Sequence, residues 1–300
     1  MMNQNDATSS FLTQLEVTEI DNVIKRAPDR DLTFADVFAI KQLANPNAET
    51  GWYYVADSDE GSVHLLRSLA ECEKIFVSAQ KVTYPVYLMG IGYNLKVSDI
   101  EASRAWNQPL DTQEVSRATR AVQEKLNKLA YVGDSEFGVP GILSEAGITA
   151  ITGTTLSSST TKCNDFIGYF NSLPVIYRNR FQYTLVVADR EYKELVKIGN
   201  TYNDKSVADQ LKAAIPNLTI AMPEVNLDAG TALYDGSTVA AGTALLIPKA
   251  VEACNMPLAK APNTTMKMYE DIQEIKGTVN ARAGPVEVIF PTSIGKITGL

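Results

Sequence analysis

Reactive side chains are few and scattered in this chain. His64 is the only histidine, which rules out metal sites built from paired histidines and leaves any serine or cysteine nucleophile dependent on a single base. Cys72, Cys163 and Cys254 are an odd, widely spaced set without a C-x-x-C pair, so neither a disulfide framework nor a zinc site is predicted. We expect His64 to be an ordinary strand or interface residue and the thiols to lie reduced in the core.

Two groups of acidic residues could hold a cation. The segment from Asp57 to Gly61 resembles the start of a calcium-binding loop, but Ser68 stands where that loop needs its bidentate glutamate. Asp134 and Glu136 could bind a cation or share a proton, yet the glycines on either side of them favour a turn after a helix. A solvated turn is expected at both places, and no metal site is predicted.

Motifs for nucleotide or hydrolase chemistry are absent from the sequence. It contains no G-x-S-x-G, G-x-x-x-x-G-K-[ST] or G-x-G-x-x-G pattern. A formal net charge of −8 argues against a protein whose task is to bind phosphate backbones. We predict no catalytic residue and no cofactor. One enzyme alternative stays open, a soluble α/β enzyme with its active site at strand ends near Asp189 or Asp228.

Composition limits the class of protein. The chain has 300 residues, of which 45% are hydrophobic, and this is enough for one large domain or two smaller ones. Its apolar runs are far shorter than the roughly 18 residues that span a bilayer, and no basic region followed by an apolar stretch opens the chain. We expect a soluble protein that is neither secreted nor held in a membrane.

The clearest element is an amphipathic helix from Asp111 to Tyr131. Asp111 and Glu114 have the spacing of a capping box, and Gly133 follows as a candidate C′ cap. Apolar residues recur at three- and four-residue intervals and predict one stripe that faces a core. The stripe consists of Val115, Ala118, Val122, Leu126 and Leu129.

Before this helix the sequence predicts an arm and a long hairpin. The arm contains one short helix between Phe34 and Leu43. The aromatic run Trp52–Tyr54 begins an extended ribbon that turns at residues 57–61 and returns; it has no interleaved Arg or Lys, so packing is favoured over base stacking. Since a two-stranded ribbon is marginal in water, it needs another surface, which a second copy of the chain can supply.

The second half alternates short strands with helices, an order typical of a compact α/β unit. The predicted strands are Tyr183 to Ala188, Leu218 to Met222 and Thr243 to Ile247, and the predicted helices are Glu191 to Ile198 and Lys205 to Ile215. The chain then closes with a predicted hairpin made of residues 274–281 and 286–290.

The order of these parts resembles that of tailed-bacteriophage major capsid proteins with the Hong Kong 97-type fold, which encapsulins share. The resemblance rests on the long helix, on the G-D-x-x-x-G-x-x-G-[IL]-[IL] turn from Gly133 to Leu143, and on the returning terminal hairpin. It extends from about Trp52 onwards. It implies an α+β fold with an N-terminal arm, an extended β-hairpin loop, a peripheral domain with a long spine helix, and an α/β axial domain.

The same resemblance implies domain boundaries. The N-terminal arm is expected at 1–48, the extended loop at 49–84, the peripheral domain at 85–183 and 251–300, and the axial domain at 184–250. Some relatives crosslink a lysine of the extended loop to an asparagine of a neighbouring subunit. Lys74 and Lys81 lie in that region, but the Asn and Glu partners have no matched positions, so no crosslinking activity is predicted.

The function implied is structural, without enzyme activity. The chain is expected to self-assemble through pentamers and hexamers into an icosahedral shell that encloses phage DNA without sequence-specific binding. It would be part of the virion capsid and be assembled in the host cytoplasm, with scaffold, portal and decoration proteins as candidate partners. An encapsulin-type nanocompartment for a cargo enzyme is the alternative with the same fold. The contacts expected between subunits are Trp52, Tyr53, Tyr54, His64, Leu66, Lys74 and Phe76.

Overall fold

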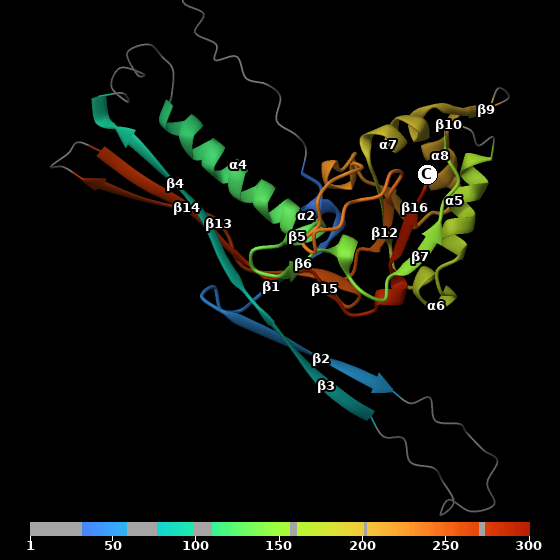
Figure 1. Cartoon of the computed structure of the whole chain (residues 1–300), viewed down its shortest axis with the longest axis horizontal. Helices are drawn as coiled ribbons and strands as arrows, with labels where there is room; N and C mark the ends of the chain where they lie inside the picture. Colours follow the sequence, from blue (N-terminus) through green and yellow to red (C-terminus); the bar gives the residue numbers. More distant parts are fainter. Residues whose placement is uncertain (1–31, 59–76, 99–109, 157–160, 201–202, 270–273) are drawn as a thin grey trace, which may run out of the picture.

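The structure, a computed structural model, describes residues 32–58, 77–98, 110–156, 161–200, 203–269 and 274–300. These residues form two five-stranded sheets with covering helices, and a two-stranded hairpin that projects from them (Figure 1). Across these ranges, no helix combines the length and apolar composition that a bilayer crossing requires.

The first sheet contains the longest strands. Its spatial order is β1-β13-β14-β4, and β15 pairs with β13. Only β1 runs parallel to its neighbour, and the other described pairs are antiparallel. The strands are β1 (Ala39–Gln42), β13 (Cys254–Tyr269), β14 (Glu274–Ala283), β4 (Tyr87–Lys96) and β15 (Glu287–Val288).

Helix α4 (Leu110–Tyr131) lies along one face of the first sheet (Figure 1). The predicted stripe is its buried face, since Ala118, Val122, Leu126 and Leu129 are all buried, and burial of each leucine contributes roughly 1.5–3 kcal/mol. The helix is therefore where the periodicity predicts it. The predicted N-cap is wrong, because α4 already includes Leu110 and so places Asp111 inside its first turn.

The second sheet lies beside the first and has the order β11-β8-β12-β16-β7. Every residue of β8 and β12 is buried, as in a sheet covered on both faces. Its strands are β11 (Leu218–Ile220), β8 (Tyr183–Val187), β12 (Ala244–Pro248), β16 (Gly295–Thr298) and β7 (Thr149–Thr152). Two of these strands, β7 and β16, come from outside the 184–250 segment.

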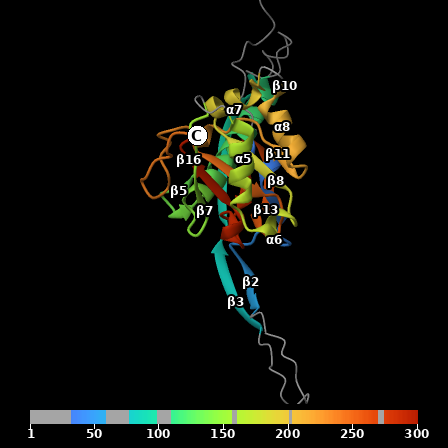
Figure 2. The same cartoon turned by 90° about the vertical axis from the view of Figure 1, so that its right-hand side faces the viewer.

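Helices α5 and α8 lie side by side against the second sheet (Figure 2). The helices of this half are α5 (Lys162–Asn171), α6 (Val175–Arg178), α7 (Asp189–Val196) and α8 (Val207–Ala214). Helix α2 (Phe34–Val37) is a single turn. Two short strand pairs join β5 (Gly133–Asp134) to β6 (Val139–Pro140) and β9 (Ile198–Asn200) to β10 (Asn203–Ser206). The 3-10 helices are η2 (Ile142–Ser144), η3 (Val225–Leu227) and η5 (Pro291–Ser293).

Two hydrophobic cores meet at the second sheet. Leu245 and Ile247 of β12 face the core that α4 and the first sheet enclose, whereas Leu246 faces the core under α5 and α8. Because side chains alternate along a strand, one strand serves both cores. The two halves of the molecule are therefore packed on a shared layer.

The predicted terminal hairpin is wrong. β14 pairs with β13 and β4, and β15 pairs with β13, so residues 274–281 and 286–290 do not pair with each other. Strand β13 itself was not predicted. It contains Pro257 and Pro262 and two register shifts, and prolines and bulges disrupt the alternating pattern by which a strand is recognised.

The packed fold begins earlier than the sequence analysis expected. Val37 and Phe38 are fully buried in the core below α4, and the predicted helix between Phe34 and Leu43 is only the single turn α2, followed by strand β1. The packed part of the chain thus begins before Trp52. A short segment with one helical turn and one strand has too little periodicity to be read from sequence alone.

Candidate functional site

The projecting hairpin is formed by β2 (Thr50–Ser58) and β3 (Val77–Pro85). The strands pair antiparallel from Thr50 opposite Pro85 to Ser58 opposite Val77, so the turn predicted from Asp57 starts too early. Figures 1 and 2 both show the ribbon leaving the body of the molecule. At its base, one face of the ribbon packs on the body and the other face is exposed.

One face of the hairpin carries exposed aromatic rings. Trp52 and Tyr54 are 54% and 59% exposed, and their ring centroids are 5.2 Å apart. The Lys81 ammonium lies 5.0 Å from the Trp52 ring centroid, within the range of a cation–π interaction. We call Trp52, Tyr54 and Lys81 the aromatic face. Exposed large aromatic side chains gathered on a projecting element are typical of protein contact surfaces.

The other predicted contact residues divide into two groups. Tyr53 points to the opposite face of the hairpin, where its ring centroid lies 6.2 Å from that of Tyr84. His64, Leu66, Lys74 and Phe76 lie outside the described residues, as does Cys72. The assignment of these residues to subunit contacts stays a prediction.

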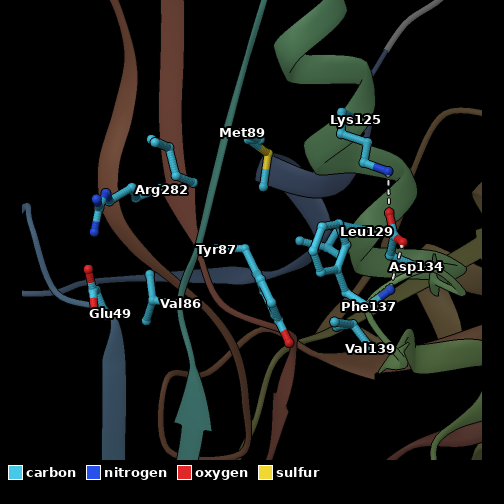
Figure 3. A pocket seen from close by; sticks show the side chains of 11 residues that line it. Glu49, Val86, Tyr87, Met89, Lys125, Leu129, Asp134, Phe137, Val139 and Arg282 are labelled. Carbon is cyan, nitrogen blue, oxygen red and sulfur yellow. Dashed lines mark hydrogen bonds and ion pairs between the residues drawn. The ribbon is translucent and has the colours of Figure 1, made fainter.

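A pocket of about 360 Å³ lies where the hairpin joins the body (Figure 3). Its walls are largely apolar and come from β4, from the end of α4 and from the turn after it. The Tyr87 and Phe137 rings meet in this pocket with centroids 5.4 Å apart, and Phe137 and Leu88 are each 61% exposed. The pocket was not predicted from the sequence, although Phe137, an apolar residue inside an acidic turn, was a usable signal.

Asp134 closes one rim of the pocket. It pairs with Lys125 of α4 and accepts backbone N–H bonds from Glu136 (3.0 Å) and Phe137 (3.3 Å). The hydrogen bond from Lys125 holds the pKa of the Asp134 carboxyl below its usual range. The acidic turn is thus a structural turn, as its glycines indicate, and Glu136 does not share its role.

Among the residues that the structure describes, the acidic and thiol groups lie in separate places. In the described part of the chain, no three His, Cys, Asp or Glu side chains are placed to hold a metal ion. Asp189 forms an exposed ion pair with Lys193, and Asp228 ends helix η3; neither lines the pocket. Burial raises the pKa of the Cys254 thiol, which disfavours the reactive thiolate.

A buried carboxylate was not foreseen from the sequence. Glu224 is 2% exposed and accepts hydrogen bonds from Thr33 Oγ1, from Asn127 Nδ2 at 3.0 Å, and from Asn226 N at 3.1 Å. The Tyr131 hydroxyl lies 2.8 Å from Thr33 Oγ1. Buried polar groups need such partners, and these join the N-terminal segment, α4 and η3. We interpret the Glu224 cluster as structural.

Comparison with known proteins relates part of the sequence to a protein family. A family model described as major capsid protein matches residues 70–165. The match covers about a third of the chain, from just before the second strand of the hairpin to the start of α5. No curated protein sequence matches the chain.

Solved structures of capsid proteins share the fold over nearly the whole chain. The capsid of Myoviridae phage XM1 matches with a TM-score of 0.75 and 14% identity, covering 95% of this chain and 98% of that one. The capsid of a native GTA particle matches with a TM-score of 0.69 and 11% identity over 99% and 100%. A virus-like particle from Pyrococcus furiosus matches with a TM-score of 0.53 and 13% identity over 87% and 90%. The fold is thus of the Hong Kong 97-like capsid type.

Proposed function

We propose that this chain is a major capsid protein that self-assembles through pentamers and hexamers into an icosahedral shell that encloses phage DNA. The observation that carries the proposal is the aromatic face of a hairpin that projects from a capsid fold. Identical copies that contact one another through different surfaces close into rings, and many moderate contacts add up to a stable shell. The net charge of −8 suits a wall that does not hold phosphate tightly.

Each part of the fold has a proposed role in the shell. Residues 1–48 act as the N-terminal arm and 49–84 as the extended loop, while 85–183 with 251–300 form the peripheral domain around α4 as its spine helix. Residues 184–250 form the axial domain at the capsomer centre. The second sheet supports this division only in part, since β7 and β16 complete it from the peripheral segments.

Contacts between subunits are proposed to involve the hairpin. Trp52 and Tyr54 support this because they are exposed together, whereas Tyr53 packs within its own chain. His64, Leu66, Lys74 and Phe76 are proposed as further contacts. Scaffold, portal and decoration proteins are proposed partners, and assembly is proposed to occur in the host cytoplasm before the shell becomes part of the virion.

Negative-stain electron microscopy combined with light scattering tests the proposal. We expect the purified chain, alone or with a co-expressed scaffold, to form uniform hollow shells or rings of five and six subunits. Nucleic acid inside shells isolated from the native source would support a phage capsid, and a protein cargo would indicate a nanocompartment instead. A chain that stays a small compact particle at every concentration, with and without a scaffold, would contradict the proposal.

A further inference from the structure

The base of the hairpin has a small core of its own. Tyr84 and Val86 from the hairpin strand pack on Ala259 of β13, with Leu43 and Tyr53 partly buried around them. This cluster is separate from the two large cores. The hairpin is therefore attached to the body by a distinct set of contacts.

The Tyr84 ring is held between two glycines. A Cβ atom on Gly51, which lies opposite Tyr84 in the hairpin, would come within 2.2 Å of Tyr84 Cζ. A Cβ atom on Gly284, which follows β14, would come within 2.9 Å of Pro257 Cγ and 3.1 Å of Tyr84 Cδ2. The ring thus lies flush against the hairpin on one side and the body on the other, with no room for a larger residue at either glycine.

A partly buried ion pair lies beside this ring. The Lys41 ammonium of β1 is 3.0 Å from Glu287 Oε2 of β15, and the Glu287 side chain is 1% exposed. The same ammonium lies 5.8 Å from the Tyr53 ring centroid and 6.0 Å from that of Tyr84. One cation therefore contacts both tyrosines of the hairpin base and a carboxylate of the body, which ties the two together through charge and cation–π attraction.

Backbone hydrogen bonds complete the attachment. Val86 N–H donates to the Glu49 carbonyl at 2.8 Å, and Gly284 N–H donates to the Pro257 carbonyl at 2.9 Å. Arg282 Nη1 donates to the carbonyls of residues 47 and 48 at 3.0 and 3.2 Å. The Arg282 bonds hold the chain just before β2 against the body. The Val86 bond closes the base of the hairpin, and the Gly284 bond lies in the body where Gly284 meets the Tyr84 ring.

We propose that Tyr84, Lys41 and Glu287 form a joint that sets the angle at which the hairpin leaves the body. The described ribbon is roughly 30 Å long, because each strand residue adds about 3.3 Å, so a tilt of about 10° at the joint would move its far end by about 5 Å. Contact surfaces fit to well below that distance. The joint therefore determines where the aromatic face meets a neighbouring copy. This inference rests on the proposed shell function.

Hydrogen exchange on unassembled subunits tests the joint directly. Tyr84→Ala should accelerate exchange of the Val86 and Gly284 amides by about tenfold or more, while the amides of β8 and β12 keep their rates. Tyr54→Ala is the matched control, because it removes an aromatic ring from the opposite, exposed face of the same hairpin, and it should leave both amides unchanged. Unchanged exchange at Val86 and Gly284 in Tyr84→Ala would overturn the joint.

Tyr84→Ala could destabilise the whole subunit, and faster exchange of the β8 amides would then reveal this. In that case a second variant tests the joint. Lys41→Met with Glu287→Gln removes both charges and leaves no buried unpaired ion, so the fold should persist. Faster exchange confined to Val86 and Gly284 would support the joint, and unchanged exchange would overturn it. Shells assembled from this variant should vary more in diameter than wild-type shells. If the wild-type chain forms no shells, the proposed function fails while the exchange result still stands.

Discussion

Gly133 shows how strongly one residue can be required by its position. It follows α4 with φ of 85°, and a Cβ atom there would lie 2.1 Å from the Val139 carbonyl oxygen. Gly138, in the same turn, has φ of 64° but open space around it. Both positions favour glycine by conformation, and only the first also excludes a side chain by contact.

We predict that Gly133→Ala lowers the free energy of unfolding by about 3 kcal/mol, whereas Gly138→Ala lowers it by about 1 kcal/mol. The first variant adds a collision with backbone to the left-handed strain that the two variants share. Urea denaturation of the unassembled subunits measures both values. Equal losses would show that the turn relaxes around the added methyl group.

The Asp134 carboxyl should make stability depend on pH. Its pKa is lowered in the folded chain, first by the hydrogen bond from Lys125, so its contribution is complete above the unfolded pKa of about 4 and is lost as pH falls through the folded pKa. Asp134→Asn should cost about 1 kcal/mol at pH 7, because Lys125 is half exposed.

The difference between Asp134→Asn and wild type should shrink below pH 4, as measured by denaturant unfolding at several pH values. Glu136→Gln is the charge-matched control and should change the free energy of unfolding by less than about 0.5 kcal/mol. A constant difference between Asp134→Asn and wild type down to pH 2 would contradict the role of the ion pair.

At the scale of elements, the Glu224 cluster fixes the N-terminal segment to α4. Thr33→Val keeps the shape of the side chain but leaves Glu224 Oε2 without one donor and the Tyr131 hydroxyl without its acceptor. We expect a loss of about 1–3 kcal/mol in the free energy of unfolding. Thr83→Val, at an exposed position of β3, should stay within about 0.5 kcal/mol of wild type. Thermal or urea unfolding measures the free energy of unfolding of both variants. Equal losses in the two variants would show that the Glu224 cluster does not stabilise the fold.

Elements with a strong local pattern were predictable and elements defined by distant partners were not. For the stripe around Leu126 and the apolar run of β8, the local pattern of apolar residues is enough to predict which side chains are buried. Strand β13 is instead defined by its pairing with β1, β14 and β15 across a chain interrupted by Pro257 and Pro262. Local periodicity contains no information about such partners.

The candidate site was predictable in the same uneven way. Trp52 and Tyr54 could be assigned to an exposed face because they alternate along a β-prone run. The same alternation places Tyr53 on the opposite face of the strand. Its contacts with Lys41 and Tyr84 were not predictable, because these residues come from segments that only the folded chain brings together. The pocket beside Phe137 is lined by residues from distant parts of the chain, among them Glu49, Met89 and Arg282, and its one sequence signal is the phenylalanine within the acidic turn.

At the scale of the whole molecule, the aromatic face should matter for assembly and not for folding. Trp52→Ala with Tyr54→Ala removes two exposed rings, so the free energy of unfolding should change by less than about 0.5 kcal/mol. The protein concentration at which shells appear should rise about tenfold or more, because each contact is repeated throughout the shell.

Light scattering against protein concentration measures the threshold for Trp52→Ala with Tyr54→Ala. Met222→Ala, which truncates an apolar side chain that is 58% exposed and lies outside the hairpin, serves as the control for surface hydrophobicity. If the double variant forms shells at the same protein concentration as wild type, the aromatic face is not part of the assembly contacts.

The continuity of β3 with β4 has a mechanical consequence. The two strands follow one line through Val86 (Figure 1), and β4 pairs with β14 from Tyr87 opposite Ala283 to Lys96 opposite Glu274. A pull along the hairpin loads these hydrogen bonds in shear, since they lie perpendicular to the strands, and all of them share the tension. A pull across the hairpin would open them one at a time. In the proposed shell, a wall whose plane contains the hairpin would resist stretching along the hairpin far better than it resists peeling.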